Sequence, residues 1–245
     1  MFQKIFYLLL FTFYFSSLFP QRVEVLEKGE TANLKKQPKI DYLFTEPDND
    51  ERIFYVATVN AIGFKNVAQL FDAIRLEAGR MGANCFRLEE YIPGEKNSSL
   101  TLRTYFALQD YLDENDQLNE LNVIYVFGND KFEVGNISFK INGKKTEINN
   151  RTYLRYENEI GGKIKINKGG FTGTSVTIKG EENRPATYLS LSGFNVVPAA
   201  GYSTMNFGFG VLGGASASVS LSTGKINYID PNLANLLLLI WKESE

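Results

Sequence analysis

Hydrophobic residues between positions 66 and 82 recur with the period of an α-helix. The stripe consists of Val67, Leu70, Phe71, Ile74, Ala78 and Met81. Spacings of three and four place these side chains on one face of a helix. Asn66 can cap this helix, with Gln69 three positions later as in a capping box, and Gly82 can end it in the left-handed conformation. Three charged residues lie off the stripe and are expected to face water: Asp72, Arg75 and Arg80.

Segments before and after this helix alternate with the period of a β-strand instead. They are residues 52–59, 85–92, 99–108 and 121–127. The first and the last of them are apolar on both faces, as expected of central strands. The order of one strand, one helix and three strands predicts a small α+β unit over residues 52–128, with one helix packed on a sheet.

Residues 129–245 have the pattern of an antiparallel β-sandwich with a helix at its end. Short alternating segments are separated by turn signals such as Asn142-Gly143, which indicates a sandwich or a partial barrel. Asp230 and Pro231 are suited to begin a helix. The apolar face of that helix contains Leu233, Leu236, Leu237, Ile240 and Trp241. We therefore expect an α+β protein in which a one-helix-on-sheet unit precedes an antiparallel β-sandwich with a docked C-terminal helix.

Residues 1–21 have the features of a secretory signal peptide. Lys4 precedes an apolar run over residues 5–15, which is shorter than the roughly 20 residues that a membrane-spanning helix needs. A second interpretation, an uncleaved anchor, stays open because no small-x-small cleavage site follows the run. Residues 22–51 are expected to form a polar leader, flexible at first, with at most a short strand at Val23–Leu26. The expected location is periplasmic, outer-membrane-associated or extracellular.

The composition argues against several classes of function. The chain has 26 Lys and Arg, 28 Asp and Glu, no His and one Cys, with a net charge of −2. No cluster of Lys and Arg is visible along the sequence, so we do not expect a nucleic-acid partner. Zinc and copper sites need clustered Cys and His. An all-oxygen site, such as one for calcium, stays open, but the acidic stretches 48–51 and 113–117 lack the glycine and the distal glutamate of a calcium loop. We therefore interpret them as solvated loops and expect no metal and no cofactor.

The single cysteine belongs to the strand that follows the first helix. One face of that strand is predicted to carry Phe86, Leu88 and Ile92. The other face is predicted to carry Cys85, Arg87, Glu89 and Tyr91. A reactive thiol needs a nearby His, a cation or a helix N-terminus, whereas Cys85 follows a helix C-terminus. We expect a buried or half-buried structural cysteine; pairing between two chains stays open because Cys85 has no partner in its own chain.

No catalytic or cofactor-binding residue is assigned from the sequence. Glu89 and Glu90 are adjacent on a strand, so they should point to opposite faces and not flank one bond. The glycine pattern at 208–213 precedes period-2 alternation instead of a helix, which does not fit a dinucleotide site. Three N-x-[ST] sequons, which matter only in a eukaryotic secretory host, begin at Asn97, Asn136 and Asn150.

Two parts of the chain resemble known bacterial families. The helix-to-strand junction at Gly82, Ala83 and Asn84 resembles small domains described as heavy-metal-binding and the core of the stress-sensing outer-membrane lipoprotein of the Rcs pathway, over roughly residues 50–125. This chain lacks the extra cysteines of the stress sensor and any soft metal cluster, so neither function is expected here. The strand at 122–128 (NVIYVFG), the strand that begins TYL at 152, the turn Gly161-Gly162 and the closing strand that contains Tyr188 form a second pattern. Over residues 122–191 it looks like that of a domain-of-unknown-function family related to PEGA domains, which implies an exported or envelope protein.

These observations predict an exported, non-enzymatic binding or structural module of the cell envelope or the outside medium, with an envelope protein or a glycan as partner. Membrane association is expected only through an uncleaved N-terminal segment, and the oligomeric state stays open. The Gly/Ser-rich residues 206–224 are a candidate contact surface, because small side chains let another chain approach closely. Internal packing of that region against Leu236 and Trp241 is the competing interpretation. A carboxylate-dependent hydrolase is the alternative function.

Overall fold

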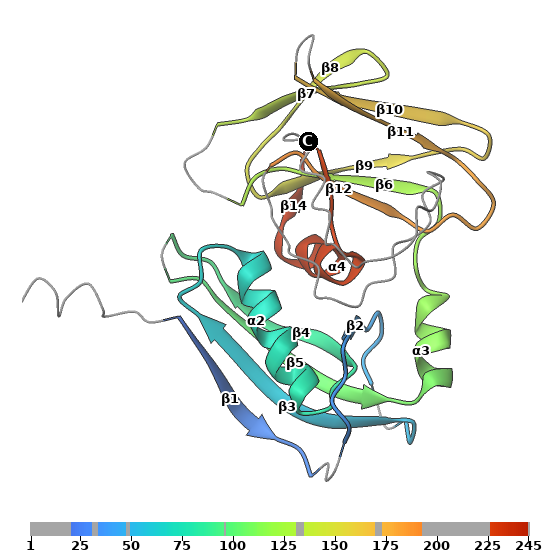
Figure 1. Cartoon of the computed structure of the whole chain (residues 1–245). Coiled ribbons are helices and arrows are strands. Elements are labelled where there is room, and N and C mark those ends of the chain that lie inside the picture. The colour runs from blue at the N-terminus through green and yellow to red at the C-terminus, as the bar shows by residue number, and fades with distance from the viewer. Residues whose placement is uncertain are drawn as a thin grey trace, which may run out of the picture.

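The computed structural model describes residues 21–30, 34–47, 50–95, 97–130, 135–169, 173–192 and 226–244. Over these ranges the chain is a mixed α+β fold with three helices and three β-sheets (Figure 1). Most strand pairs are antiparallel, and a helix stands near the C-terminus, so the expected fold class is confirmed. The predicted signal segment, apart from Gln21, and the Gly/Ser-rich candidate surface lie outside the described residues.

The first sheet has five strands in the order β1-β3-β5-β4-β2. Their bounds are β1 (Arg22–Lys28), β2 (Asp41–Tyr42), β3 (Ile53–Ile62), β4 (Cys85–Ile92) and β5 (Ser99–Ala107). Helix α2 (Val67–Arg80) packs on one face of this sheet (Figure 1). Its stripe is buried at Val67, Leu70, Phe71, Ile74 and Ala78, as the periodicity predicts.

The expectation of a polar leader over residues 22–51, flexible up to about residue 39, is wrong for the strands β1 and β2. β1 pairs along its length with β3, and β2 pairs with β4. The short strand expected at Val23–Leu26 is thus longer and belongs to the first sheet. Val23 and Val25 pack against the core, which is why a segment with so many charged residues is held in place.

Helix α2 begins and ends where the sequence predicts. The Asn66 side chain accepts a hydrogen bond from the Gln69 backbone N–H at 2.9 Å, and Gly82 has a φ of 94°. The expectation that Arg75 faces water is wrong: Arg75 is buried and pairs with Asp72. The segment before β2 covers part of α2 outside its apolar stripe. There the Gln37 backbone N–H donates a hydrogen bond to the Gly79 carbonyl at 2.8 Å.

A bulge in β4 changes which side chains share a face. The pairing of β4 with β5 shifts register between Leu88 and Glu90. Because one extra residue reverses the alternation beyond it, Tyr91 packs on the same core as Phe86, whereas Ile92 is half exposed. The predicted faces of this strand are therefore correct before the bulge and wrong after it.

The second and third sheets form a sandwich. The four-stranded sheet has the order β11-β10-β7-β8 and the five-stranded sheet the order β13-β12-β6-β9-β14. Their bounds are β6 (Val123–Phe127), β7 (Ile137–Ile141), β8 (Lys144–Ile148), β9 (Thr152–Glu157), β10 (Lys163–Lys168), β11 (Thr174–Lys179), β12 (Thr187–Ser190), β13 (Asn227–Tyr228) and β14 (Lys242–Glu243). Residues from both sheets share one core, for example Val126 and Leu189 with Phe139 and Ile166.

Two features of the sandwich differ from the expected antiparallel arrangement. The β12–β6 and β14–β9 pairs are parallel. In addition, β6 hydrogen-bonds within the five-stranded sheet and not within the first sheet, where the sequence order had placed it. A strand that is apolar on both faces fits this position, since β6 has the sandwich core on one side and α4 on the other.

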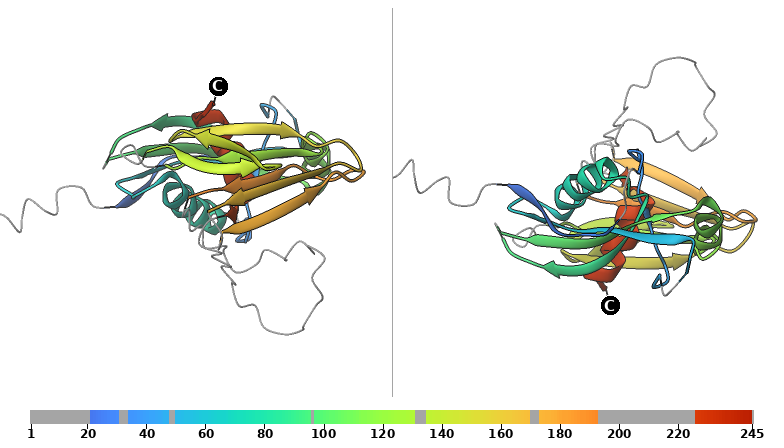
Figure 2. Two further views of the ribbon diagram at one scale, coloured as in Figure 1. Left: turned by 90° about the horizontal axis from the view of Figure 1, so that it is seen from above. Right: turned by 90° about the horizontal axis from the view of Figure 1, so that it is seen from below.

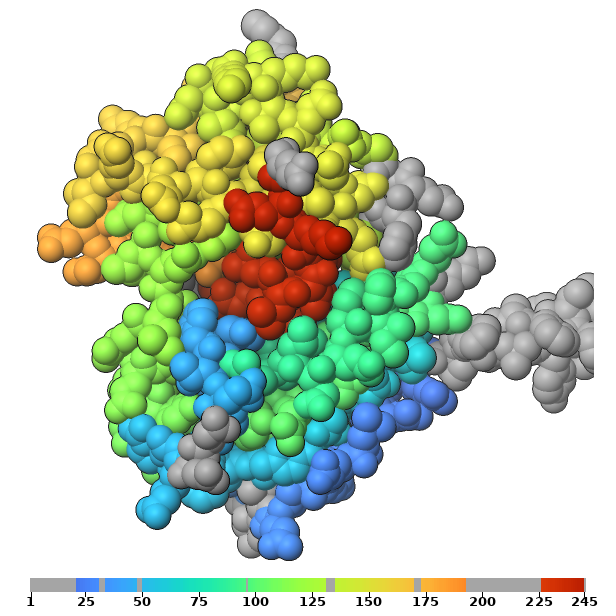
Figure 3. Space-filling view, turned by 180° about the vertical axis from the view of Figure 1, so that it is seen from behind, coloured from blue at the N-terminus to red at the C-terminus, as the bar shows by residue number. Residues whose placement is uncertain are grey.

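Helix α4 (Pro231–Ile240) lies between the first sheet and the sandwich (Figure 1). Seen from behind, its atoms fill the space between the two parts of the molecule (Figure 3). Leu233, Leu236 and Leu237 are fully buried in one core that also contains Val59 of β3 and Phe127 of β6. The expected docking is confirmed, and the helix joins both sheets instead of covering one.

Two polar side chains of α4 form hydrogen bonds, one with the first sheet and one with the sandwich. The Asn232 Oδ1 atom accepts a hydrogen bond from the Tyr42 backbone N–H of β2 at 2.7 Å. One turn later, the Tyr188 hydroxyl of β12 donates to Asn235 Oδ1 at 3.2 Å. Both asparagines are buried, so these bonds specify the orientation of a helix that is apolar on most of its surface.

A second polar contact joins the sandwich to α2. Asp130, which follows β6, accepts the Val67 backbone N–H at 2.7 Å, at the first turn of the helix. Its other carboxylate oxygen lies 3.3 Å from the Arg151 Nε atom, and Arg151 also contacts the Tyr91 hydroxyl. Burial raises the pKa of the Asp130 carboxyl, although the Val67 N–H and Arg151 act in the opposite direction.

We expect Leu237→Ala to lower the free energy of unfolding by about 2–5 kcal/mol, because it opens a cavity between the two sheets. Leu239 of the same helix is 51% exposed, so Leu239→Ala should cost about 0.5 kcal/mol or less. Urea unfolding followed by the fluorescence of Trp241, the only tryptophan, and by far-UV circular dichroism should give coincident transitions. Equal losses for the two variants would contradict the burial of Leu237 between the two sheets and the exposure of Leu239.

We expect Asp130→Ala to cost about 1–3 kcal/mol, because the buried Val67 N–H loses its acceptor. Asp130→Asn keeps a neutral oxygen for that N–H and avoids the burial of a charge, so it should cost less than the alanine variant. Chemical denaturation of both variants measures the difference. An asparagine variant that is the less stable of the two would show that the pairing with Arg151 matters more than the helix contact.

Candidate functional site

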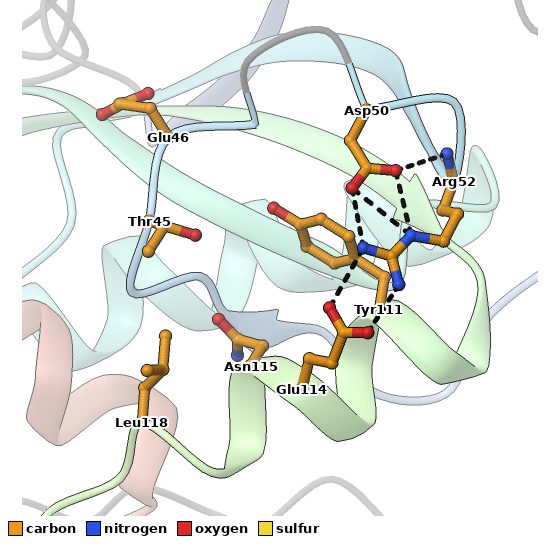
Figure 4. Close-up of a pocket in the computed structure, with 8 residues that line it drawn as sticks. All are labelled: Thr45, Glu46, Asp50, Arg52, Tyr111, Glu114, Asn115 and Leu118. Atoms are coloured by element: carbon orange, nitrogen blue, oxygen red, sulfur yellow. Dashed lines mark hydrogen bonds and ion pairs between the residues drawn. The ribbon is translucent and has the colours of Figure 1, made fainter.

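A pocket opens at the end of the first sheet, between residues 45–46 and 50–52 on one side and helix α3 (Gln109–Asp116) on the other. Its volume is about 380 Å³. It is lined by Thr45, Glu46, Asp50, Arg52, Tyr111, Glu114, Asn115 and Leu118 (Figure 4). Helix α3 lies in the acidic and polar connection between β5 and β6. The prediction of a solvated loop at residues 113–117 is therefore wrong for residues 113–116, which are helical.

Asn115 holds the chain that forms one wall of the pocket. Its Oδ1 atom accepts the Phe44 backbone N–H at 2.9 Å, and its Nδ2 atom donates to the Tyr42 carbonyl at 2.8 Å. The side chain thus pairs with the backbone after β2 as a neighbouring strand would. Because Asn115 is 4% exposed, these bonds are shielded from water and fix the distance between α3 and residues 42–45.

Arg52 crosses the pocket and joins two carboxylates. Its Nε and Nη2 atoms donate to Asp50 at 3.0 and 2.7 Å, while Nη1 and Nη2 donate to Glu114 at 2.8 and 3.0 Å. The guanidinium lies over the Tyr111 ring, 5.2 Å from its centroid. Figure 4 shows the fork between the two acids, with the Tyr111 ring next to the guanidinium. A planar guanidinium suits this bidentate geometry, which an ammonium does not reproduce.

The charges of this cluster stabilise one another. Hydrogen bonds from Arg52 lower the pKa of Asp50 to about 2 and also lower the pKa of Glu114. The same two carboxylates raise the pKa of Arg52. All three groups are therefore ionised near neutral pH, and neither carboxyl holds a proton that it could donate to a leaving group.

Glu46 adds a third carboxylate to the pocket. It pairs with Arg87 of β4 at 2.5 Å, and the Arg87 Nη1 atom donates to the Leu43 carbonyl at 2.9 Å. Glu114 uses one lone pair of each oxygen for Arg52, so it retains acceptor capacity. The arrangement can accept hydrogen bonds from hydroxyl or ammonium groups of a small polar molecule.

Cys85 is buried in a small apolar cluster that also contains Tyr111 of the pocket. Its thiol lies 3.5 Å from the Tyr105 carbonyl, among Leu43, Ala107 and Tyr111. Burial raises the pKa of the thiol well above its ordinary value, and the charge of Asp41 acts in the same direction. The interpretation as a structural cysteine is confirmed in its burial, and a thiol enclosed in this way is poorly placed to pair with a second chain.

The other residues singled out from the sequence do not come together. Glu89 and Glu90 are exposed next to the β4 bulge, and Glu89 pairs with Arg103 at 3.4 Å. Of the three sequon asparagines, two are exposed and one is half-buried: Asn97, Asn136 and Asn150. Within the described ranges, no group of three or more Cys, Asp and Glu side chains is arranged to hold a metal ion.

The pocket itself was not found from the sequence. Arg52 and Glu114 are 62 positions apart, and the only local signal was the polar turn before β3. Nothing in that turn predicts which helix it meets. Within the described residues, moreover, no helix is long and apolar enough to cross a membrane.

Comparisons with family models, with curated proteins and with solved structures return no match for this chain. The resemblances to the heavy-metal-binding-like and PEGA-like families therefore stay predictions.

We expect Arg52→Gln to remove an acid-labile contribution to stability. Ionised Asp50 stabilises the fold above its ordinary pKa of 3.8, and this contribution is lost as the pH falls through about 2. Urea midpoints measured from pH 5 to pH 2 should therefore fall less steeply in Arg52→Gln than in the unchanged protein. The matched control is Arg22→Gln, at an exposed pair with Glu24; an equal change in the slope of both variants would contradict the assignment.

Proposed function

We propose that this chain is an exported, non-enzymatic module that binds a hydroxyl-rich ligand, such as an envelope glycan, in the pocket that Thr45, Arg52 and α3 line. The proposal of export is supported by the apolar run after Lys4, and the proposal of binding by a pocket whose lining includes three carboxylates, Glu46, Asp50 and Glu114. Carboxylates are strong acceptors for sugar hydroxyls, and rigid acceptors reduce the entropy lost on binding.

The observation that carries this proposal is the double fork of Arg52 with Asp50 and Glu114. It fixes the acceptors before any ligand arrives and keeps both carboxylates ionised. Thr45 is exposed at the rim of the pocket, and its hydroxyl makes no hydrogen bond among the described residues. This hydroxyl can donate a hydrogen bond to a ligand. A volume of about 380 Å³ lies in the range of small-molecule sites.

The alternative, a carboxylate-dependent hydrolase, needs one carboxyl with a raised pKa to act as the acid. Both pKa values in the Asp50–Glu114 pair are lowered instead. A single guanidinium also occupies the space between the two groups, where a scissile bond would have to lie. The pocket therefore supports binding better than hydrolysis.

Titration calorimetry with a panel of neutral oligosaccharides tests the proposal. We expect at least one to bind, and we expect Glu114→Gln to weaken that binding roughly tenfold, as for the loss of a hydrogen bond to a charged group. Thr45→Val should weaken binding without disturbing Arg52. Glu90→Gln, which removes the same charge from an exposed strand position, should bind normally.

Two outcomes would overturn the proposal. Binding that is unchanged in both pocket variants would place the ligand elsewhere. Release of sugar products at a rate that depends on Glu114 would favour the hydrolase, and analysis of the titrated mixtures by chromatography detects it.

A further inference from the structure

The outer face of the four-stranded sheet carries an unusual concentration of one charge. Alternation along β7, β8, β10 and β11 directs five exposed lysines to the face opposite the sandwich core. They are Lys140, Lys145, Lys163, Lys165 and Lys179. We call this set the lysine face. One exposed acid, Glu147, shares it, in a chain whose net charge is −2.

The pairing of the strands brings like charges together on this face. Lys163 lies directly opposite Lys179, and Lys140 lies directly opposite Lys145. Like charges at such cross-strand positions destabilise a sheet. Glu147 pairs with Lys145 at 3.3 Å; for the other four lysines, no ion pair is found within the described part of the chain.

The exposed arginines of the first sheet, in contrast, each have an acidic partner: Arg22 pairs with Glu24 and Arg103 with Glu89. A face that served only solubility would mix both signs in the same way. The uncompensated lysines therefore indicate an external anionic partner.

The shape of the lysine face restricts what that partner can be. Seen from above, its strands lie open, with no described element over them (Figure 2). Between the lysines stand small polar residues, Ser138, Ser175 and Thr177. Neither arginine nor an aromatic ring is on this face among the described residues, whereas single-stranded nucleic acids are held by stacking on aromatic rings and base edges are read by forked side chains.

We propose that the lysine face docks the protein on the surface of a bilayer that contains anionic lipids. An open sheet face with several exposed lysines can present their ammonium groups to a bilayer surface together, and the phosphate headgroups supply the opposite charge. Each lysine near such a surface contributes roughly a fivefold gain in partitioning. The sequence suggested membrane association only through an uncleaved N-terminal segment; the lysine face provides a separate, electrostatic route that does not depend on the ligand pocket.

Vesicle co-sedimentation of the full chain tests this proposal, with vesicles of phosphatidylcholine alone and of phosphatidylcholine mixed with phosphatidylglycerol. The test variant replaces Lys140, Lys163, Lys165 and Lys179 by glutamine. The control makes the same charge change at exposed lysines off the face, namely Lys28, Lys35, Lys36 and Lys65. Because the N-terminal apolar segment is the same in all three proteins, the difference between the two kinds of vesicle isolates the electrostatic part.

We expect the unchanged protein and the control to bind the anionic vesicles more strongly than the neutral ones. In the test variant, the ratio of anionic to neutral binding should be at least about tenfold lower. Raising the salt to about 0.5 M should abolish the preference in all cases, because screening shortens the range of the attraction. Thermal unfolding of the test variant should be unchanged or slightly raised, since two like-charge pairs are removed.

Three results would overturn the proposal: no preference of the unchanged protein for anionic vesicles, an equal loss in the control, or binding to soluble RNA through the same lysines without binding to vesicles. The last result would assign the face to a nucleic acid instead.

Discussion

The burial of helix α4 between two sheets is the constraint on which the rest of this structure depends. A helix that is apolar around most of its circumference cannot remain on a surface and must be enclosed. Leu233 and Leu237 lie in one core with residues of β3 and β6, strands that are far apart in the sequence. The first sheet and the sandwich thus share a hydrophobic core that only the last described residues complete.

Such a core would tolerate many orientations if apolar contacts alone defined it. Buried polar groups remove this freedom, since each must keep its hydrogen bond. Asn232 and Asn235 connect α4 to different sheets, and Asp130 connects the sandwich to the first turn of α2. These directional contacts fix one arrangement of the two parts.

The rigid arrangement leaves two exposed regions with different chemistry. At the pocket, Arg52 is balanced by Asp50 and Glu114, so the charges are ordered and locally neutralised. On the lysine face, the charges repel one another and no described residue compensates them except Glu147. The first pattern suits a small ligand that is recognised by hydrogen bonds; the second suits a broad anionic surface. The two regions belong to different sheets on either side of α4 (Figure 1).

Local signals in the sequence determined much of this protein, because they act over a few residues. The stripe of α2, its Asn66 cap, the Gly82 stop and the Asp230 cap of α4 all depend on contacts within one or two turns. The pairing of β1 with β3, the bulge after Leu88 and the place of β6 in the sandwich depend on partners distant in the chain. The same holds for the pocket and the lysine face: alternation gave each lysine its side of a strand, but only the tertiary structure decided which strands would lie together.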